Sequence, residues 1–222
     1  SACEISEETI KKIERLGITS NVVEIAKIRE NKTLSKSDGT KKIRLAGIPK
    51  LDDANRAGGS EGHKCKLILT EGDSAKSMAI SGLSVVGRDI YGAFPLKGKV
   101  MNVRDASIDQ IMKNSEITNM KKILGLVNGK VYTDTKSLRY GKIMIMTDQD
   151  HDGSHIKGLL FNVFQTLWSS LYKYDGFLTS MLTPIIKATN TSTKEIISFY
   201  NMSDYESWSD NIDRKSQWKI KY

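Results

Sequence analysis

Two short apolar runs, each ending at an acidic residue, are the clearest pattern in the chain. The run at residues 67–70 leads directly into Glu71, and the run at residues 143–147 leads into Asp148. Short apolar runs bounded by Gly and Asp are typical of buried β-strands. We therefore predict two strands, each with a carboxylate at its C-terminal end.

The remaining apolar positions predict helices around these strands. Residues 154–171 place their apolar side chains on one helical face, with Trp168 expected in the core. Shorter helices are predicted over residues 6–15, 20–30, 75–82, 107–114 and 119–124, and β-like segments over residues 185–188 and 195–200. The expected helix N-caps are Ser6, Asp73 or Ser74, and Ser154. Alternating strands and helices predict an α/β fold with a parallel sheet flanked by helices.

Charge is concentrated near the N-terminus. Residues 27–50 hold eight basic side chains against Glu30 and Asp38. Their middle, residues 33–40, is polar and predicts a flexible, partly disordered linker. A solvated tether and a segment that follows DNA explain this charge equally well.

Composition narrows the class of protein. The 222 residues are 39% hydrophobic, enough for one or two domains with a sizeable core. We expect no membrane span and no secretory signal. Two cysteines, Cys3 and Cys65, fit a reducing compartment. A net charge of +8 favours a polyanionic partner such as DNA.

The acidic run after the second strand suggests a metal site. In an extended backbone Asp148, Asp150 and Asp152 would share one face, and three close anions favour a hard cation, Mg²⁺ before Ca²⁺. Glu71 would join them if the two strands are neighbours. An EF-hand is disfavoured because Leu159 occupies its twelfth position. A polar turn without metal stays open.

A basic loop at residues 95–99, Pro-Leu-Lys-Gly-Lys, is a second candidate. Its resemblance to a nucleotide-binding P-loop fails, since the spacing is one residue too long and Val100 replaces Ser or Thr. Lysine ammonium groups and backbone N–H donors can still hold DNA phosphates. An ordinary surface loop is the alternative.

Several longer motifs carry a family resemblance. They are Ile48-Pro49-Lys50-Leu51-Asp52-Asp53-Ala54-Asn55, Glu71-Gly72-Asp73-Ser74-Ala75, the loop at residues 95–99, Asn102-Val103-Arg104-Asp105-Ala106, Leu138-Arg139-Tyr140-Gly141-Lys142 and the segment from Thr147 to Ile156. In this order they resemble the Toprim region of eukaryotic type II DNA topoisomerases, from about residue 43 to residue 222. The resemblance implies a Toprim, Rossmann-like parallel sheet flanked by helices, with an N-terminal helical and linker segment and a C-terminal β-containing extension.

The resemblance also implies roles for individual residues. Glu71, Asp148 and Asp150 would be catalytic residues and ligands of Mg²⁺, with Asp152 a supporting ligand; Mn²⁺ or Ca²⁺ could substitute. Glu71 could also act as a general acid toward the 3′ oxygen during religation. The residues implied to contact double-stranded DNA are Lys97, Lys99, Asn102 and Arg104. Position 97 is often Arg in animal enzymes, so Lys97 keeps the charge but not the planar fork. His151 and His155 more often cap or pack than catalyse.

The implied organisation has four parts. Residues 1–42 would end the transducer-like region, 43–64 lead in, 65–182 form the Toprim domain, and 183–222 extend toward a winged-helix domain. The family's nucleophilic Tyr and ATP site lie outside these parts, so we expect the chain alone neither to cleave nor to relax DNA. The related enzymes are ATP-hydrolysing nuclear homodimers, whereas this chain is expected to be a monomer. A Toprim nuclease that uses water, and a non-catalytic DNA-binding module, are the competing interpretations.

Overall fold

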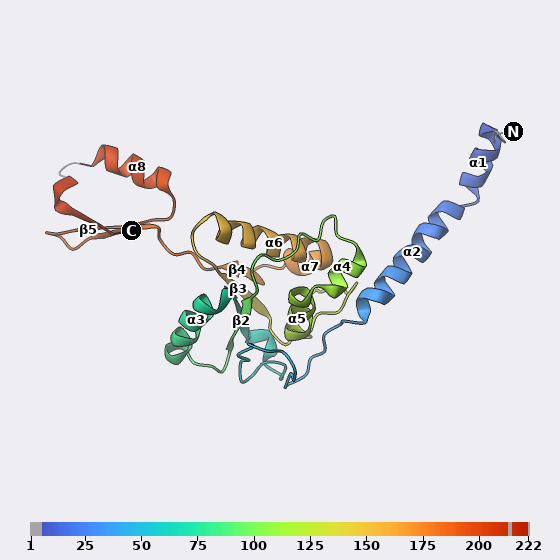
Figure 1. Cartoon of the computed structure of the whole chain (residues 1–222), viewed down its shortest axis with the longest axis horizontal. Coiled ribbons are helices and arrows are strands. Elements are labelled where there is room, and N and C mark those ends of the chain that lie inside the picture. The colour runs from blue at the N-terminus through green and yellow to red at the C-terminus, as the bar shows by residue number, and fades with distance from the viewer. Residues whose placement is uncertain (1–5, 213–214, 222) are drawn as a thin grey trace.

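The chain forms three parts along its length (Figure 1). The computed structural model describes residues 6–212 and 215–221; Cys3, named above, lies outside them. Two helices, α1 (Glu7–Arg15) and α2 (Ile18–Ser35), project from a central α/β body, and a small antiparallel sheet with one helix stands at the opposite side. No described helix is long and apolar enough to cross a membrane.

The central sheet is parallel, as the alternation of strands and helices predicted. Its strands are β1 (Lys66–Glu71), β2 (Tyr91–Leu96), β3 (Lys142–Met146) and β4 (Leu178–Ser180), in the order β2-β1-β3-β4. The apolar pattern found β1 and β3 but missed β2 and β4. Strand β2 contains Gly92 and Pro95, and it is an edge strand, where proline is tolerated.

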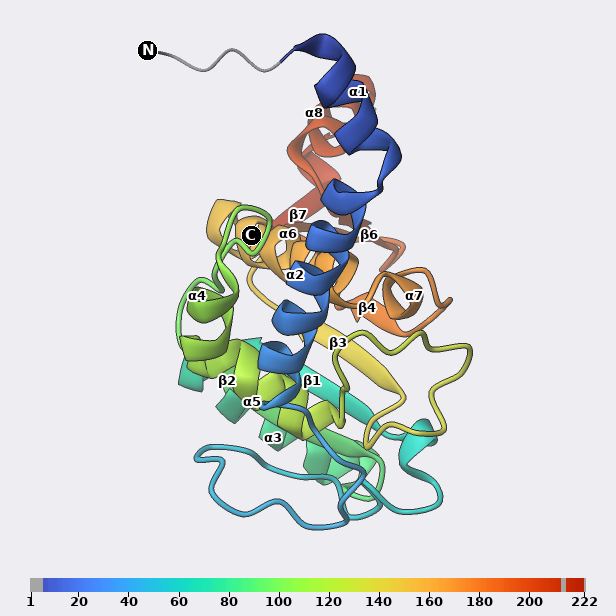
Figure 2. The ribbon, with the colours of Figure 1, turned by 90° about the vertical axis from the view of Figure 1, so that its right-hand side faces the viewer.

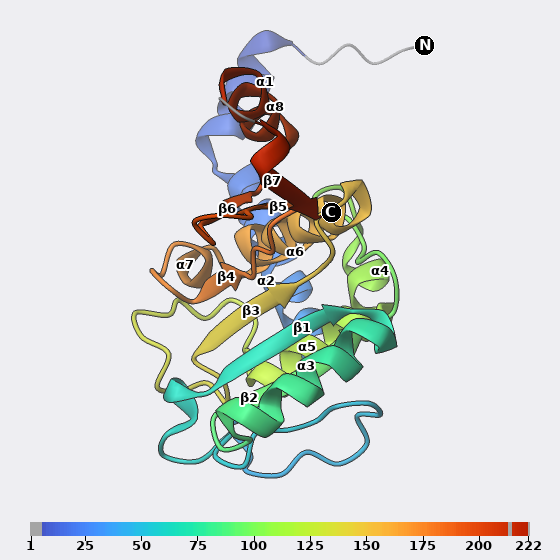
Figure 3. The ribbon, with the colours of Figure 1, turned by 90° about the vertical axis from the view of Figure 1, so that its left-hand side faces the viewer.

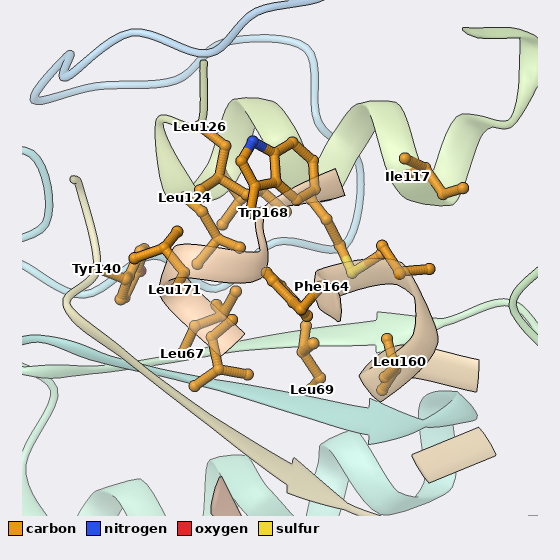
Figure 4. Close-up of a cluster of buried hydrophobic side chains, with 14 of the residues drawn as sticks. Leu67, Leu69, Ile117, Leu124, Leu126, Tyr140, Leu160, Phe164, Trp168 and Leu171 are labelled. Atoms are coloured by element: carbon orange, nitrogen blue, oxygen red, sulfur yellow. The ribbon is translucent and has the colours of Figure 1, made fainter. Parts of the chain in front are cut away.

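Helices cover both faces of this sheet. The helix α3 (Gly72–Val86) lies on one face, where Ile68 of β1 packs with Ala79 and Leu83 (Figure 3). Leu67 and Leu69 point to the other face, because side chains alternate along a strand. There they join the main core (Figure 4) under α4 (Ile108–Lys113), α5 (Ser115–Leu124), α6 (His151–Leu167) and α7 (Ser169–Tyr172). A short 3₁₀ helix, Gly62–Lys64, precedes β1.

Several predicted helix ends were wrong. The helix α3 begins at Gly72, so Glu71 is its N-cap in place of Asp73 or Ser74. The helix α6 begins at His151 with Asp150 as its N-cap, and Ser154 already donates its N–H to the Asp150 carbonyl inside the helix. The helix α5 begins four residues earlier than predicted, because the Asn114 side chain caps it at residue 117. Two expectations are confirmed: Ser6 accepts the Thr9 N–H, and Trp168 is buried.

The predicted linker at residues 33–40 is also wrong, because this segment is docked. The helix α2 continues to Ser35, and Leu34 is buried. The Lys121 ammonium of α5 donates to the Leu34 carbonyl at 2.8 Å and to Ser37 Oγ at 2.9 Å, and pairs with Asp38 at 3.0 Å. The C-terminal end of α2 lies beside α5 (Figure 2), and the cation there satisfies the free Leu34 carbonyl at that end of α2.

A buried arginine fixes the irregular segment before β1. The Arg139 guanidinium is fully buried and donates to the carbonyls of Lys42 at 2.6 Å and Ile123 at 2.8 Å. It also pairs with Asp53, which accepts a second hydrogen bond from the Tyr140 hydroxyl. Burial beside Asp53 raises the pKa of Tyr140 far above its usual value, so the hydroxyl stays a donor.

The C-terminal part has its own small core. Strands β5 (Ile186–Asn190), β6 (Ile196–Phe199) and β7 (Trp218–Lys221) form an antiparallel sheet in the order β6-β5-β7. The helix α8 (Met202–Asn211) covers one face, and a 3₁₀ turn, Lys215–Gln217, precedes β7. Four aromatic rings in edge-to-face and tilted contacts fill the space between: Phe199, Tyr205, Trp208 and Trp218.

Candidate metal and nucleic-acid site

The two predicted strands are neighbours, and this meets the condition under which their strand-end carboxylates were expected to come together. Strands β1 and β3 pair directly, with Thr70 opposite Met146. Glu71 is the last residue of β1, and Asp148 follows β3 by two residues. Both line one cavity of about 390 Å³ beyond the carboxyl edge of the sheet. Ligand sites in open α/β sheets lie at this edge.

One carboxylate oxygen of Glu71 is left without a hydrogen-bond partner. Its Oε2 atom is buried and has no hydrogen-bond partner among the described residues. Burial raises the pKa of Glu71, and the charges of Asp150 and Asp148 raise it further. Buried polar atoms normally have a partner, so an orphaned carboxylate oxygen beside other carboxylates fits a bound cation or a retained proton.

The loop between β3 and α6 is tightly turned. Asp148 and Asp150 are exposed, and Asp150 Oδ1 accepts the Gly153 N–H at 2.7 Å. A Cβ atom at Gly153 would lie 2.1 Å from the Asp148 carbonyl oxygen, so only glycine fits here. The expected extended face of three aspartates is wrong, because β3 ends at Met146 and Asp152 already belongs to α6.

Asp152 is engaged by the basic loop. It pairs with Lys99 at 2.8 Å, which lowers the pKa of Asp152 and raises that of Lys99. Within the described residues, no three His, Cys, Asp or Glu side chains are gathered closely enough to hold a metal ion alone. The edge therefore brings Glu71 and Asp148 to one cavity, and a cation there would need further ligands from water or a phosphate.

The basic loop lies at the same edge. Leu96, the last residue of β2, is opposite Glu71, so Lys97 and Lys99 extend past the sheet beside the carboxylates, and both are exposed. Asn102 and Arg104 are exposed a few residues on, where they line a second cavity of about 400 Å³ against α6. Cationic and acidic groups are thus adjacent at one end of the sheet.

Two supporting residues were missed by sequence reasoning. The buried Glu116, in the first turn of α5, accepts the Lys97 backbone N–H at 3.4 Å. Asn162 of α6 accepts the Val103 N–H at 3.2 Å. An acidic residue just after the Asn114 cap is a common helix-start signal. That signal does not show whether Glu116 is a surface carboxylate or one that positions the loop at Lys97, 19 residues earlier in the chain.

Comparison with known proteins identifies the fold family. A model of the Toprim domain matches residues 66–178, and a model of the C-terminal associated domain of TOPRIM matches residues 181–222. This chain belongs to the Toprim domain family. The Toprim sheet is the β2-β1-β3-β4 sheet that carries the acidic edge.

Relatives confirm the narrower resemblance to eukaryotic type II topoisomerases. The chain is 56% identical over its whole length to 16% of a DNA topoisomerase 2 of Saccharomyces cerevisiae, and 51% identical to 14% of the human DNA topoisomerase 2-beta. A crystal structure of the Plasmodium falciparum topoisomerase II DNA-binding, cleavage and re-ligation domain is 54% identical, with a TM-score of 0.74 over 82% of this chain and 24% of that one. The chain thus spans about a sixth of the curated relatives it matches.

Proposed function

We propose that this chain is the Toprim part of an ATP-dependent type II DNA topoisomerase, and that its acidic edge holds the Mg²⁺ used in reversible double-strand cleavage. The observation that carries the proposal is the orphaned Oε2 atom of Glu71, buried beside Asp148 at the carboxyl edge. The similarity of the whole chain to topoisomerase sequences supports it.

The proposed ligands are Glu71, Asp148 and Asp150, with Asp152 contributing through water. Mn²⁺ or Ca²⁺ could replace Mg²⁺, since all three prefer oxygen ligands. A bound ion would polarise the scissile phosphate and offset negative charge on the leaving oxygen. Asp148 is exposed and lines the same cavity as Glu71, and it is proposed as the ligand shared between two ion positions.

Protein groups would do the remaining work. The raised pKa of Glu71 suits a carboxyl group that would give a proton to the 3′ oxygen as it leaves during cleavage and take that proton back during religation. Lys97, Lys99, Asn102 and Arg104 would hold the DNA backbone on the same side, and Glu116 would fix the loop that presents the two lysines. The attacking Tyr would come from elsewhere in the parent enzyme, as would the ATP site.

The parent enzyme is proposed to be a nuclear homodimer that acts on double-stranded DNA. The chain alone is proposed to be a monomer that cannot relax supercoiled DNA. Detectable relaxation by the isolated chain would contradict this part of the proposal.

Calorimetry of metal binding tests the proposal. Mg²⁺ and Mn²⁺ are titrated into the wild-type chain, a Glu71→Ala/Asp150→Ala variant and an Asp73→Asn control, each with and without a nicked duplex. Asp73 is an exposed carboxylate of the same edge that pairs with Lys50, so its loss should not matter. We expect saturable binding in the wild type and control and none in the double variant.

Other outcomes discriminate between the interpretations. No metal binding by the wild type, even with the nicked duplex, would favour a non-catalytic DNA-binding module. Mg²⁺-dependent nicking by the isolated chain, lost in the double variant, would favour a Toprim nuclease that uses water.

A further inference from the structure

The open face of the C-terminal sheet carries a cluster of lysines. Along β5 and β7 the side chains alternate, so Ile186, Ala188 and Ile220 point toward α8 and the aromatic core. The residues between them point to the other face, where Lys187, Lys219 and Lys221 are all exposed. We call these three side chains the lysine face.

The strand register places these charges close together. Lys187 lies directly opposite Lys221, and Lys219 lies opposite Thr189. Like charges directly opposite each other destabilise an antiparallel pair. Within the described part of the chain, none of the three lysines forms an ion pair. The sheet therefore holds a compact positive charge that nothing on its own surface neutralises.

The opposite side of this small unit has the reverse charge. The helix α8 carries Asp204, Glu206 and Asp210, all exposed, and has no Lys or Arg. General solubility would be served by mixed charges on both sides. A unit with one cationic face and one anionic face is instead oriented by a charged partner, with its lysines toward a polyanion.

We propose that the lysine face binds the phosphate backbone of duplex DNA outside the cleavage edge. The proposal rests on the proposed function, because that function supplies duplex DNA as the polyanion. Figure 1 shows the small sheet set apart from the central body, so the DNA it contacts is a segment flanking the one at the acidic edge. Ammonium groups and the Thr189 hydroxyl recognise phosphates and not bases, so the contact is independent of sequence.

The salt dependence of DNA binding tests the proposal. A labelled 40-bp duplex is titrated with the wild-type chain, with Lys187→Gln/Lys219→Gln/Lys221→Gln, and with a control that loses three other exposed lysines, Lys11, Lys12 and Lys113. Each lost phosphate contact reduces the slope of log K against log salt by about 0.9. Three lost contacts change the slope by about 2.7, or about 40-fold in affinity between 50 and 200 mM salt. The control should keep the wild-type slope.

Two further variants make the result decisive. Replacing the three lysines with Arg keeps the charge and should restore the slope, and the fluorescence of Trp208 and Trp218 reports that the unit is folded. A Lys97→Gln/Lys99→Gln variant reports on the cleavage edge.

If that variant loses affinity while the lysine-face variant matches the wild type, this inference is wrong and the proposed function stands. If the wild type binds no duplex, this inference is wrong, and the metal titration still decides the proposed function. If the lysine-face variant loses binding to poly-glutamate but not to DNA, the partner is an acidic protein and the inference is also wrong.

Discussion

Replacing Glu71 with Gln should stabilise the metal-free protein. The two side chains have nearly the same shape, but Gln removes a charge whose Oε2 atom is buried without a partner. It also removes repulsion from Asp148 and Asp150, which raise the pKa of Glu71. A catalytic carboxylate would then be a site where the protein gives up stability for function.

The size of the effect follows from burial. Gln leaves the buried atom without a partner but removes its charge, and an unsatisfied buried charge costs more than the roughly 1–3 kcal/mol of a neutral polar group. Because Glu71 is only partly buried, we expect the loss of the charge to gain about 1 kcal/mol. For a chain of this length that is an increase of about 2–4 °C in melting temperature.

The pH dependence has a definite sign. The pKa of Glu71 is raised in the folded state above its ordinary value of 4.5, so the folded protein binds the proton more tightly than the unfolded chain does. The destabilisation is absent below pH 4.5 and grows as the pH rises through the raised pKa. In the Gln variant this part of the pH dependence should disappear.

Urea unfolding followed by tryptophan fluorescence measures both effects. In EDTA the Gln variant should be more stable than the wild type at pH 7.5, with a smaller difference near pH 4.5. Adding Mg²⁺ at ten times its dissociation constant should stabilise the wild type by about 1.4 kcal/mol and leave the variant unchanged. The exposed control Asp73→Asn should change stability by no more than about 0.5 kcal/mol. A Gln variant that is less stable than the wild type in EDTA, or that keeps the Mg²⁺ effect, would refute the reasoning.

Three further substitutions test other parts of the structure. Arg139→Met should lower the free energy of unfolding by about 3–5 kcal/mol in urea, because it leaves the Asp53 carboxylate without its buried partner. Gly153→Ala should weaken Mg²⁺ binding at least about tenfold by calorimetry, since the new Cβ would collide with the Asp148 carbonyl and displace the acidic loop. Lys121→Met should speed hydrogen exchange at the C-terminal end of α2, which then loses its carbonyl and carboxylate contacts.

Each of these has a matched control on the same chain. Arg88→Met removes an exposed arginine, Gly158→Ala adds a Cβ where nothing lies within 4 Å, and Lys122→Met changes the exposed neighbour on α5. If a control reproduces the effect of its partner, the contact named for that partner is not its cause.

The parts of the fold that could be predicted were those with local signals. The strands that end at Glu71 and Asp148 are short apolar runs with turn residues after them. Strand β2 gives no such run, because Gly92 interrupts it; a Cβ there would lie 2.2 Å from the Tyr140 hydroxyl, a contact made across the fold. The docking of residues 33–40 depends on Lys121, 87 positions after Leu34, so the local polar composition was misleading.

At the site, the placement of both carboxylates at strand ends could be predicted from the sequence, whereas the adjacency of the two strands was only a condition and the side-chain directions could not be predicted. The carboxyl edge follows from parallel strands, and Glu71 and Asp148 are where that argument places them. Asp150 could continue a strand or cap a helix, and the backbone turn after it determines which. That turn is possible because residue 153 is glycine, since a side chain there would collide with the Asp148 carbonyl. Lys99, the ion-pair partner of Asp152, belongs to the loop after β2, and no local sequence pattern predicts this pairing.

The way α2 is anchored gives it a mechanical role. Its 18 residues make a rigid arm about 27 Å long, held at one end by Lys121. A rigid arm held at one end acts as a lever, so a large displacement of its far end becomes a small displacement with a larger force near the anchor. Here the anchor is α5, the same short helix whose Glu116 accepts a hydrogen bond from the backbone of the basic loop. A force on the far end of α2 would therefore reach α5 as a small displacement. Through Glu116, α5 would pass that displacement to the loop that carries Lys97 and Lys99 at the proposed DNA-binding edge.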